Sequence, residues 1–168
     1  MKIFTLFVFL LFTALSVHAQ NIADNALGLR LGDSDGFGAE ISYQRLVNRY
    51  KRVEIGFGWR DSREFDAFKF TGIYQWVHHI DGNFNWYYGV GGGLGSVDFD
   101  PIPGTGNEPE TPDGGLFVFA AGDIGVEYDF DIPLLLSLDF RPEIGILGYD
   151  DFSDNFDFDI ALGIRYQF

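Results

Sequence analysis

The chain contains no cysteine, a single methionine and only 11 lysine and arginine residues among its 168 positions. The absence of cysteine excludes a disulfide framework and any cysteine-ligated metal or redox site. The few basic residues stand against 25 aspartate and glutamate residues, which gives a formal net charge of −14. This charge argues against a nucleic-acid partner, because affinity for nucleic acid comes from lysine and arginine side chains that neutralise phosphates.

Phenylalanine and glycine are the abundant residues, with 19 and 22 copies. Aromatic residues make up 18% of the chain and hydrophobic residues 46%, so the chain is not an acidic disordered polypeptide, which would be poor in both. The length fits one domain. A mixture of bulky rings and glycine is typical of sheets that have one crowded, narrow face.

The first 19 residues have the organisation of a secretory signal peptide. Met1 and Lys2 give a short, positively charged start, and residues 3–17 are almost wholly apolar. Ala19 supplies the small residue that a cleavage site requires. The apolar run is shorter than the ~20 residues that a membrane-spanning helix needs. We therefore predict cleavage after Ala19 and a mature domain of residues 20–168.

Hydrophobicity alternates with a period of two over the last stretch of the chain. Between Phe156 and Phe168 every even position is a large apolar residue, whereas the odd positions are small, polar or charged. Only a β-strand places alternate residues on opposite faces. The segment is therefore predicted to be a strand with one apolar and one polar face.

Seven upstream segments show the same alternation, and no stretch reads as a helix. At the start of one of them Phe117 and Phe119 break the pattern. Long and short connections tend to alternate between the segments, and the strand lengths suit the about 9–11 residues of a tilted membrane strand. The eight predicted strands cover residues 27–32, 37–44, 53–60, 68–76, 84–94, 116–128, 134–146 and 156–168.

The alternation alone does not say which face is inside. A soluble barrel of the lipocalin type has its apolar residues inside, whereas a membrane barrel has them outside and is polar inside. Here the polar face is rich in Gly, Ala and Ser and carries charges of both signs, as a narrow lumen requires. The apolar face has Tyr or Trp near the strand ends, where amphipathic rings meet the membrane boundary. We predict an all-β fold, an eight-stranded antiparallel up-and-down transmembrane β-barrel.

The charged residues of the polar face are then expected to form a structural network that plugs the lumen, since enclosed charges are tolerated when they are paired. The predicted members of this network are Arg30, Glu40, Glu54, Arg60, Lys69, Asp123, Glu127, Asp139, Arg141, Glu143, Asp157, Asp159 and Arg165.

The chain resembles the small eight-stranded outer-membrane β-barrels, the OmpX-like proteins and the membrane domain of OmpA-like proteins. The resemblance rests on the strand count, the hairpin pattern and the terminal segment IALGIRYQF, residues 160–168. It implies a monomer in the bacterial outer membrane, in contact with outer-membrane lipid. It also implies insertion by the barrel-assembly machinery, which would read Tyr166 and Phe168 as its C-terminal signal. Both chain ends would lie in the periplasm.

We expect a protein that is not an enzyme, with a role in envelope structure and integrity or in surface adhesion through its acidic loops. Residues 96–113 form the longest outward segment and the best contact candidate. A narrow pore for small solutes and a lipid-modifying enzyme remain as alternatives.

Candidate chemistry is sparse, and no cofactor or intrinsic metal site is expected. His78 and His79 lack a carboxylate or cysteine partner at ligand spacing. The serines considered for a lipid-modifying site, Ser42, Ser96 and Ser137, have no histidine near them in sequence. The glycine-rich stretch 91–95 has no helix after it, so it is interpreted as room in a crowded lumen rather than as a phosphate loop.

The resulting topology predicts strongly unequal charge at the two ends of the barrel. The outward segments 32–36, 61–66, 95–115 and 148–155 hold 13 acidic residues and one basic residue, Arg63, a balance of about −12. The periplasmic end is neutral, with Asp24, Asp81, Asp129 and Asp131 against Arg45, Arg49, Lys51 and Arg52. Two interpretations are open for the outer end. It is a solvated acidic rim, or it binds divalent cations, which prefer oxygen ligands.

The cation hypothesis can be tested by replacing three of the acidic residues of the longest outward segment, Glu108, Glu110 and Asp113, with their amides. We expect calorimetric titration with calcium or magnesium to show weaker binding than in the unsubstituted protein, because oxygen ligands and negative charge are both lost. Titrations that do not change would leave the solvated rim as the correct interpretation.

Overall fold

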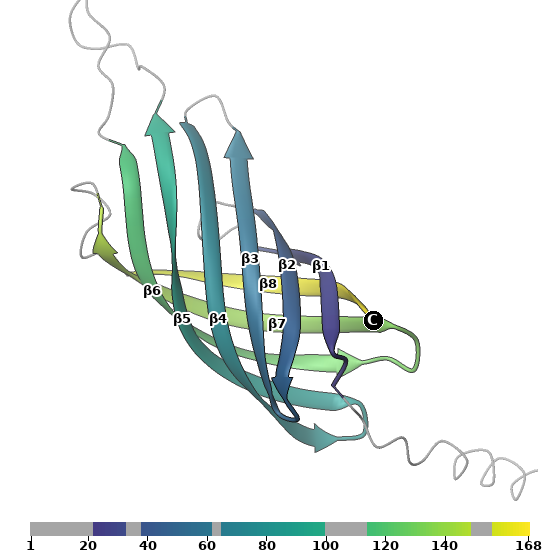
Figure 1. The fold of residues 1–168 in the computed structure, drawn as a ribbon. Helices are drawn as coiled ribbons and strands as arrows, with labels where there is room; N and C mark the ends of the chain where they lie inside the picture. The colour runs from purple at the N-terminus through teal and green to yellow at the C-terminus, as the bar shows by residue number, and fades with distance from the viewer. Residues whose placement is uncertain (1–21, 33–37, 62–64, 100–113, 149–155) are drawn as a thin grey trace, which may run out of the picture.

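The structure, a computed structural model, describes residues 22–32, 38–61, 65–99, 114–148 and 156–168. Eight strands follow one another around a closed barrel, as predicted (Figure 1). The strands are β1 (Asn25–Leu31), β2 (Ala39–Asn48), β3 (Lys51–Asp61), β4 (Phe65–Asp81), β5 (Phe84–Phe99), β6 (Gly115–Asp129), β7 (Leu134–Leu147) and β8 (Phe156–Gln167). The predicted signal peptide, residues 1–19, lies outside the described residues. Within the described ranges no helix is long and apolar enough to cross a membrane.

Every strand pairs antiparallel with the next, and β1 also pairs with β8 to close the barrel. Leu29, for example, lies opposite Ile41 of β2 on one side and Ile164 of β8 on the other. The start of β1, the end of β8 and the three short turns all lie at one end of the barrel (Figure 1). The β4–β5 turn is made tight by Gly82, whose φ of 55° suits a residue without a side chain.

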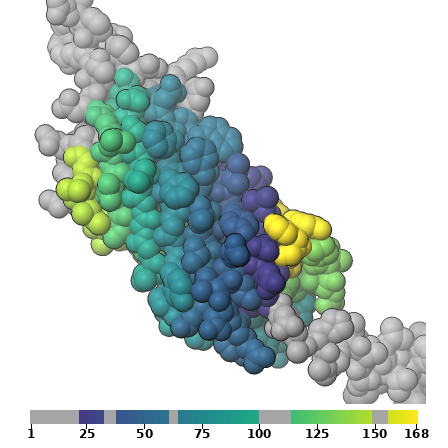
Figure 2. Space-filling model, viewed as in Figure 1, coloured from purple at the N-terminus to yellow at the C-terminus, as the bar shows by residue number. Residues whose placement is uncertain are grey.

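The apolar face of the sheet is on the outside of the barrel. Leu138, Phe158 and Leu162 are 52%, 42% and 44% exposed, whereas Arg141 and Asp159 are 1% and 2% exposed. This confirms the predicted orientation and excludes the lipocalin-type alternative. On the face seen in Figure 2 the side chains of neighbouring strands form a continuous outer surface.

Several strands run further than the sequence pattern predicted, and one assignment was wrong. Arg52 was placed in the periplasmic turn, but β2 continues to Asn48 and β3 starts at Lys51, so that only Arg49 and Tyr50 form the turn. Because Arg52 is already part of the strand, its side chain points inward and is 2% exposed. The strand start lets Tyr50 accept a hydrogen bond from the Val77 backbone at 2.9 Å, which continues the sheet to this edge.

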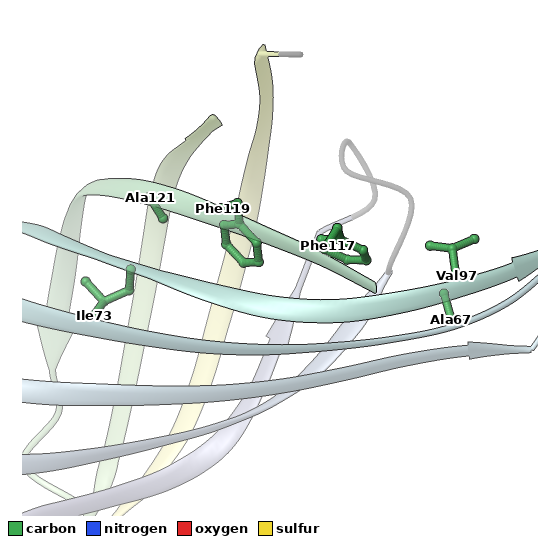
Figure 3. Packing of buried hydrophobic residues seen from close by; sticks show 6 residues of the cluster. All are labelled: Ala67, Ile73, Val97, Phe117, Phe119 and Ala121. Carbon is green, nitrogen blue, oxygen red and sulfur yellow. The ribbon is translucent and has the colours of Figure 1, made fainter. Parts of the chain in front are cut away.

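Part of the lumen is apolar, which the prediction of a polar lumen missed. Strands β4, β5 and β6 contribute a cluster of buried side chains inside the barrel, towards the end with the long connections (Figure 3). We call this cluster the apolar layer; its members are Ala67, Ile73, Val97, Phe117, Phe119 and Ala121. Phe117 and Phe119, which broke the alternation, point inward and are 3% and 1% exposed.

The glycine-rich stretch 91–95 lies in β5 and makes room for the rings of the apolar layer. Gly93 lies opposite Phe119 and Gly95 opposite Phe117 in the β5–β6 ladder. A Cβ atom on either glycine would overlap the facing phenylalanine ring. The two rings therefore fit in the lumen because the neighbouring strand has no side chains there, in agreement with the predicted role of the glycines.

This fit predicts a position-specific cost of a methyl group. G93A places a Cβ against the Phe119 ring and the Phe70 carbonyl, so we expect it to lower the free energy of unfolding by about 1–3 kcal/mol, as overpacking does. The matched control is G72A, since no atom lies within 4 Å of a Cβ built on Gly72. Urea unfolding in lipid vesicles, followed by tryptophan fluorescence, measures both variants. Equal effects would contradict the proposed packing.

Candidate functional site

The lumen holds a network of buried charges that comes from every strand except β5. Of the thirteen charged residues predicted for it, eleven are buried, with exposures of 5% or less. Arg52 joins them, and we call these twelve residues the lumen network. Two predicted members lie apart from it. The Arg60 guanidinium is half-buried, 5.5 Å from the centre of the Phe65 ring. Asp157 is exposed, and its carboxylate accepts a hydrogen bond from the Phe158 backbone at 2.8 Å.

Glu54 is the centre of the lumen network. One of its carboxylate oxygens lies 3.0 Å from the Arg141 guanidinium and 3.2 Å from the Arg165 guanidinium. The other accepts hydrogen bonds from the amides of Gln44 and Gln75 at 2.7 and 3.1 Å. These donors come from β2, β4, β7 and β8, so that one carboxylate of β3 connects the wall of the barrel across its lumen.

Arg141 carries the network from Glu54 to two further carboxylates. Its guanidinium lies 3.5 Å from Glu40 and 3.8 Å from Asp123. The Asp123 carboxylate also accepts a hydrogen bond from the Gln75 amide at 2.5 Å. Arg141 therefore lies between three acidic side chains and partly compensates the negative charge of each of them.

A second group of ion pairs lies on the side of the network nearer the apolar layer. The Arg30 guanidinium lies 2.6 Å from both Asp139 and Asp159. Lys69 lies 3.1 Å from Glu143 and 3.4 Å from Glu40, with its ammonium group 5.7 Å from the centre of the Phe119 ring. The contact between Lys69 and Phe119 joins the charged part of the lumen to its apolar part.

A third group closes the end near the chain termini. Arg52 pairs with Glu127 at 2.7 Å, donates to the Gln75 side chain at 2.5 Å and lies 4.7 Å above the Tyr87 ring. A cavity of about 10 Å³ lies beside it, lined by Gln44, Glu127 and other residues, with room for about one water molecule.

The serine and histidine residues do not form a catalytic arrangement in the described part of the chain. Ser42 and Ser137 accept hydrogen bonds from Arg165 at 2.9 and 2.7 Å inside the lumen. His78 is exposed and stacks on Trp86, with ring centres 4.8 Å apart, and His79 contacts the Asn85 side chain at 3.3 Å. The two serines thus position a buried arginine, and the histidines lie near the β4–β5 turn.

Electrostatic compensation is what this arrangement achieves chemically. Each of the five buried basic residues has a carboxylate within 4.0 Å. Within the described ranges, no group of three histidine, aspartate or glutamate residues is placed to hold a metal ion. Most of the acidic residues considered for divalent cations lie outside the described residues, as do residues 100–113 of the contact candidate 96–113.

The predicted assembly signal lies at the closing seam of the barrel. Tyr166 and Phe168 are both 60% exposed and their rings stack with centres 6.2 Å apart. Backbone hydrogen bonds of 2.9 and 3.1 Å join Phe168 to Asn25 at the start of β1. The last residue of the chain is therefore fixed to the first strand while its ring faces outward.

Arg52 is the member of the lumen network that sequence reasoning missed, although a signal for it was present. The inward positions of β3 include Glu54, Gly56 and Gly58. Counting back two residues from Glu54 reaches Arg52, so the same alternation already placed it on the polar face. The basic run around the turn concealed this, because charges beside a turn are usually exposed.

Comparison with known proteins shows the fold. No known protein family matches the sequence, and no curated protein matches it either. Among solved structures, Neisserial surface protein A (NspA) is 15% identical with a TM-score of 0.58, covering 87% of this chain and 94% of that one. The N-terminal β-barrel domain of Pseudomonas aeruginosa OprF is 10% identical with a TM-score of 0.58, covering 89% and 98%.

A third similar structure is Ail, the attachment invasion locus protein of Yersinia pestis, in complex with the heparin analogue sucrose octasulfate. It is 17% identical with a TM-score of 0.52, covering 86% of this chain and 96% of Ail. With its closed antiparallel sheet, the chain therefore has the fold of the small eight-stranded outer-membrane barrels.

The lumen network predicts a large effect of removing one buried charge. In R141M, three carboxylates lose the guanidinium that they share, so we expect the free energy of unfolding to fall by about 3–5 kcal/mol. The control is R45M, measured like R141M in vesicles of zwitterionic phosphatidylcholine alone, because Arg45 is exposed on the outside of β2. Urea unfolding in vesicles gives both values. If the free energy of unfolding of R141M fell by less than about 1 kcal/mol, the buried ion pairs would not be a main source of the stability of the barrel.

Proposed function

We propose that this chain is an integral barrel of the bacterial outer membrane, inserted as a monomer, whose lumen is sealed and conducts no solute. The observation that carries the proposal is the sequence of layers along the lumen. The pair of Arg52 and Glu127, the centre around Glu54, the pairs of Arg30 and Lys69, and the apolar layer follow one another from the terminal end towards the end with the long connections.

Each kind of layer opposes the passage of an ion for a different reason. In the charged part, the space is occupied by side chains that already pair with one another. In the apolar layer, the rings of Phe117 and Phe119 offer no polar group to replace the water of a hydrated ion, as in hydrophobic constrictions that close by dewetting. A solute would have to displace both kinds of layer.

With the lumen sealed, the role of the protein depends on its outer surface. We propose a structural role in envelope integrity or a role in surface adhesion, without enzymatic activity. The outward segments carry a charge of about −12, so they favour cationic or cation-bridged partners. Ail was solved with a sulfated polyanion; the acidic segments of this chain would repel such a ligand.

Single-channel recording in planar bilayers tests the seal. We expect no steady conductance from the folded protein, whose insertion is checked by heat-modifiable gel migration. The double variant F117A/F119A removes most of the apolar layer but keeps the ion pairs, and we expect it to stay closed as well. A steady conductance of the unsubstituted protein would overturn the sealed barrel and favour the narrow pore.

A further inference from the structure

Exposed positive charge is concentrated on one hairpin of the barrel. Arg45, Arg49 and Lys51 are the exposed basic side chains in the described part of the chain, and they come from the end of β2, the turn and the start of β3. The other described lysine and arginine residues are buried in the lumen or, in the case of Arg60, half-buried. Among the described residues the three side chains have no ion-pair partner.

The register places two of these residues together on the outer face. Arg45 lies opposite Val53, and Lys51 is two residues before Val53 on the same strand. The register shifts between Leu46 and Asn48, so that Lys51 pairs with Asn48, and both Arg45 and Lys51 are exposed on the outside of this hairpin. Arg49 follows in the turn, so all three cations surround one short stretch of the rim.

Lys51 also borders a cluster of aromatic side chains on the outside of β4 and β5. It lies directly opposite Trp76, and Trp76 lies opposite Tyr88. The Trp76 and Tyr88 rings stack with centres 5.3 Å apart, Tyr74 lies 4.9 Å from Trp76, and His78 lies 5.5 Å from Tyr88. Aromatic rings of this kind lie at the level of lipid headgroups. The three cations therefore lie at the depth of the phosphates.

The rest of this rim carries the opposite charge. Asp81 adjoins the β4–β5 turn, and Asp129 and Asp131 adjoin the β6–β7 turn. An anionic group at this end of the barrel is therefore attracted to the β2–β3 hairpin and repelled from the two other hairpins. In Figure 1 the β2–β3 turn lies at the same end of the barrel as these turns, away from the long connections.

We infer that the β2–β3 hairpin, with Trp76 beside it, binds the phosphate headgroup of an anionic phospholipid in the leaflet next to the chain termini. Guanidinium groups match phosphate oxygens with paired hydrogen bonds, and the lysine adds a point charge. The ring of Trp76 contacts the glycerol region, while the apolar face of the strands contacts the acyl chains. The inference rests on the proposed location of the barrel in a membrane.

Tryptophan quenching by brominated lipid tests the site. In the W59F variant the remaining tryptophans are Trp76, which lies opposite Lys51, and Trp86, which lies one strand further along the sheet in β5. The protein is reconstituted in phosphatidylcholine vesicles with a small, equal fraction of dibrominated phosphatidylglycerol or dibrominated phosphatidylcholine. At 50 mM salt we expect dibrominated phosphatidylglycerol to quench the tryptophan fluorescence several-fold more strongly than dibrominated phosphatidylcholine. The ratio of quenching by the two lipids should fall towards one at 500 mM salt, because exposed charges are screened.

Two further variants, in the same W59F background, separate charge from structure. R45Q/R49Q/K51Q should abolish the preference, since each cation contributes about fivefold near an anionic surface. R45K/R49K/K51R keeps the charge and should retain most of the preference. Equal quenching by the two lipids in W59F, or an unchanged preference in the glutamine variant, would overturn the site. Quenching by neither lipid would instead contradict the membrane location itself.

Discussion

The compensation of the Glu54 carboxylate inside a narrow lumen is the constraint on which the rest of the structure depends. An eight-stranded barrel has a lumen just wide enough for side chains to fill. A carboxylate enclosed there needs partners, and Glu54 receives them from β2, β4, β7 and β8. Strands that are far apart around the barrel are thereby tied to one group. The positions of Arg141 and Arg165 in turn determine which small residues and hydroxyls can stand next to them, as with Ser42 and Ser137.

The apolar layer occupies its part of the lumen with uncharged side chains. Towards the long connections, β6 places two phenylalanine rings in the lumen beside apolar side chains of β4 and β5, and glycines of β5 leave the volume that the rings need. Lys69 connects the two regions, since it pairs with Glu143 on one side and lies over the Phe119 ring on the other. The lumen is thus filled along its length by two kinds of packing that meet at one lysine.

The alternation of residues was enough to predict the fold, because a period of two has one structural meaning and the charges on the polar face required a lumen. It also placed Arg30, Glu54 and Arg165 on the inner face. It could not show which acid pairs with which base, since the partners are up to 129 residues apart and depend on the stagger of the strands. Arg52 and the rings of Phe117 and Phe119 were missed for local reasons. A basic turn sequence hid the first, and residues that were apolar on both faces concealed the second.

Among the described residues, the seam between β1 and β8 is the shortest ladder, with six paired positions against sixteen between β4 and β5. Its two strands are the first and the last in the described sequence, so they can meet only after all eight strands have been synthesised. A nascent or truncated polypeptide would therefore keep two open sheet edges, which hydrocarbon does not tolerate. Closure of the sheet is consequently an all-or-none event, which is complete only when Phe168 pairs with Asn25.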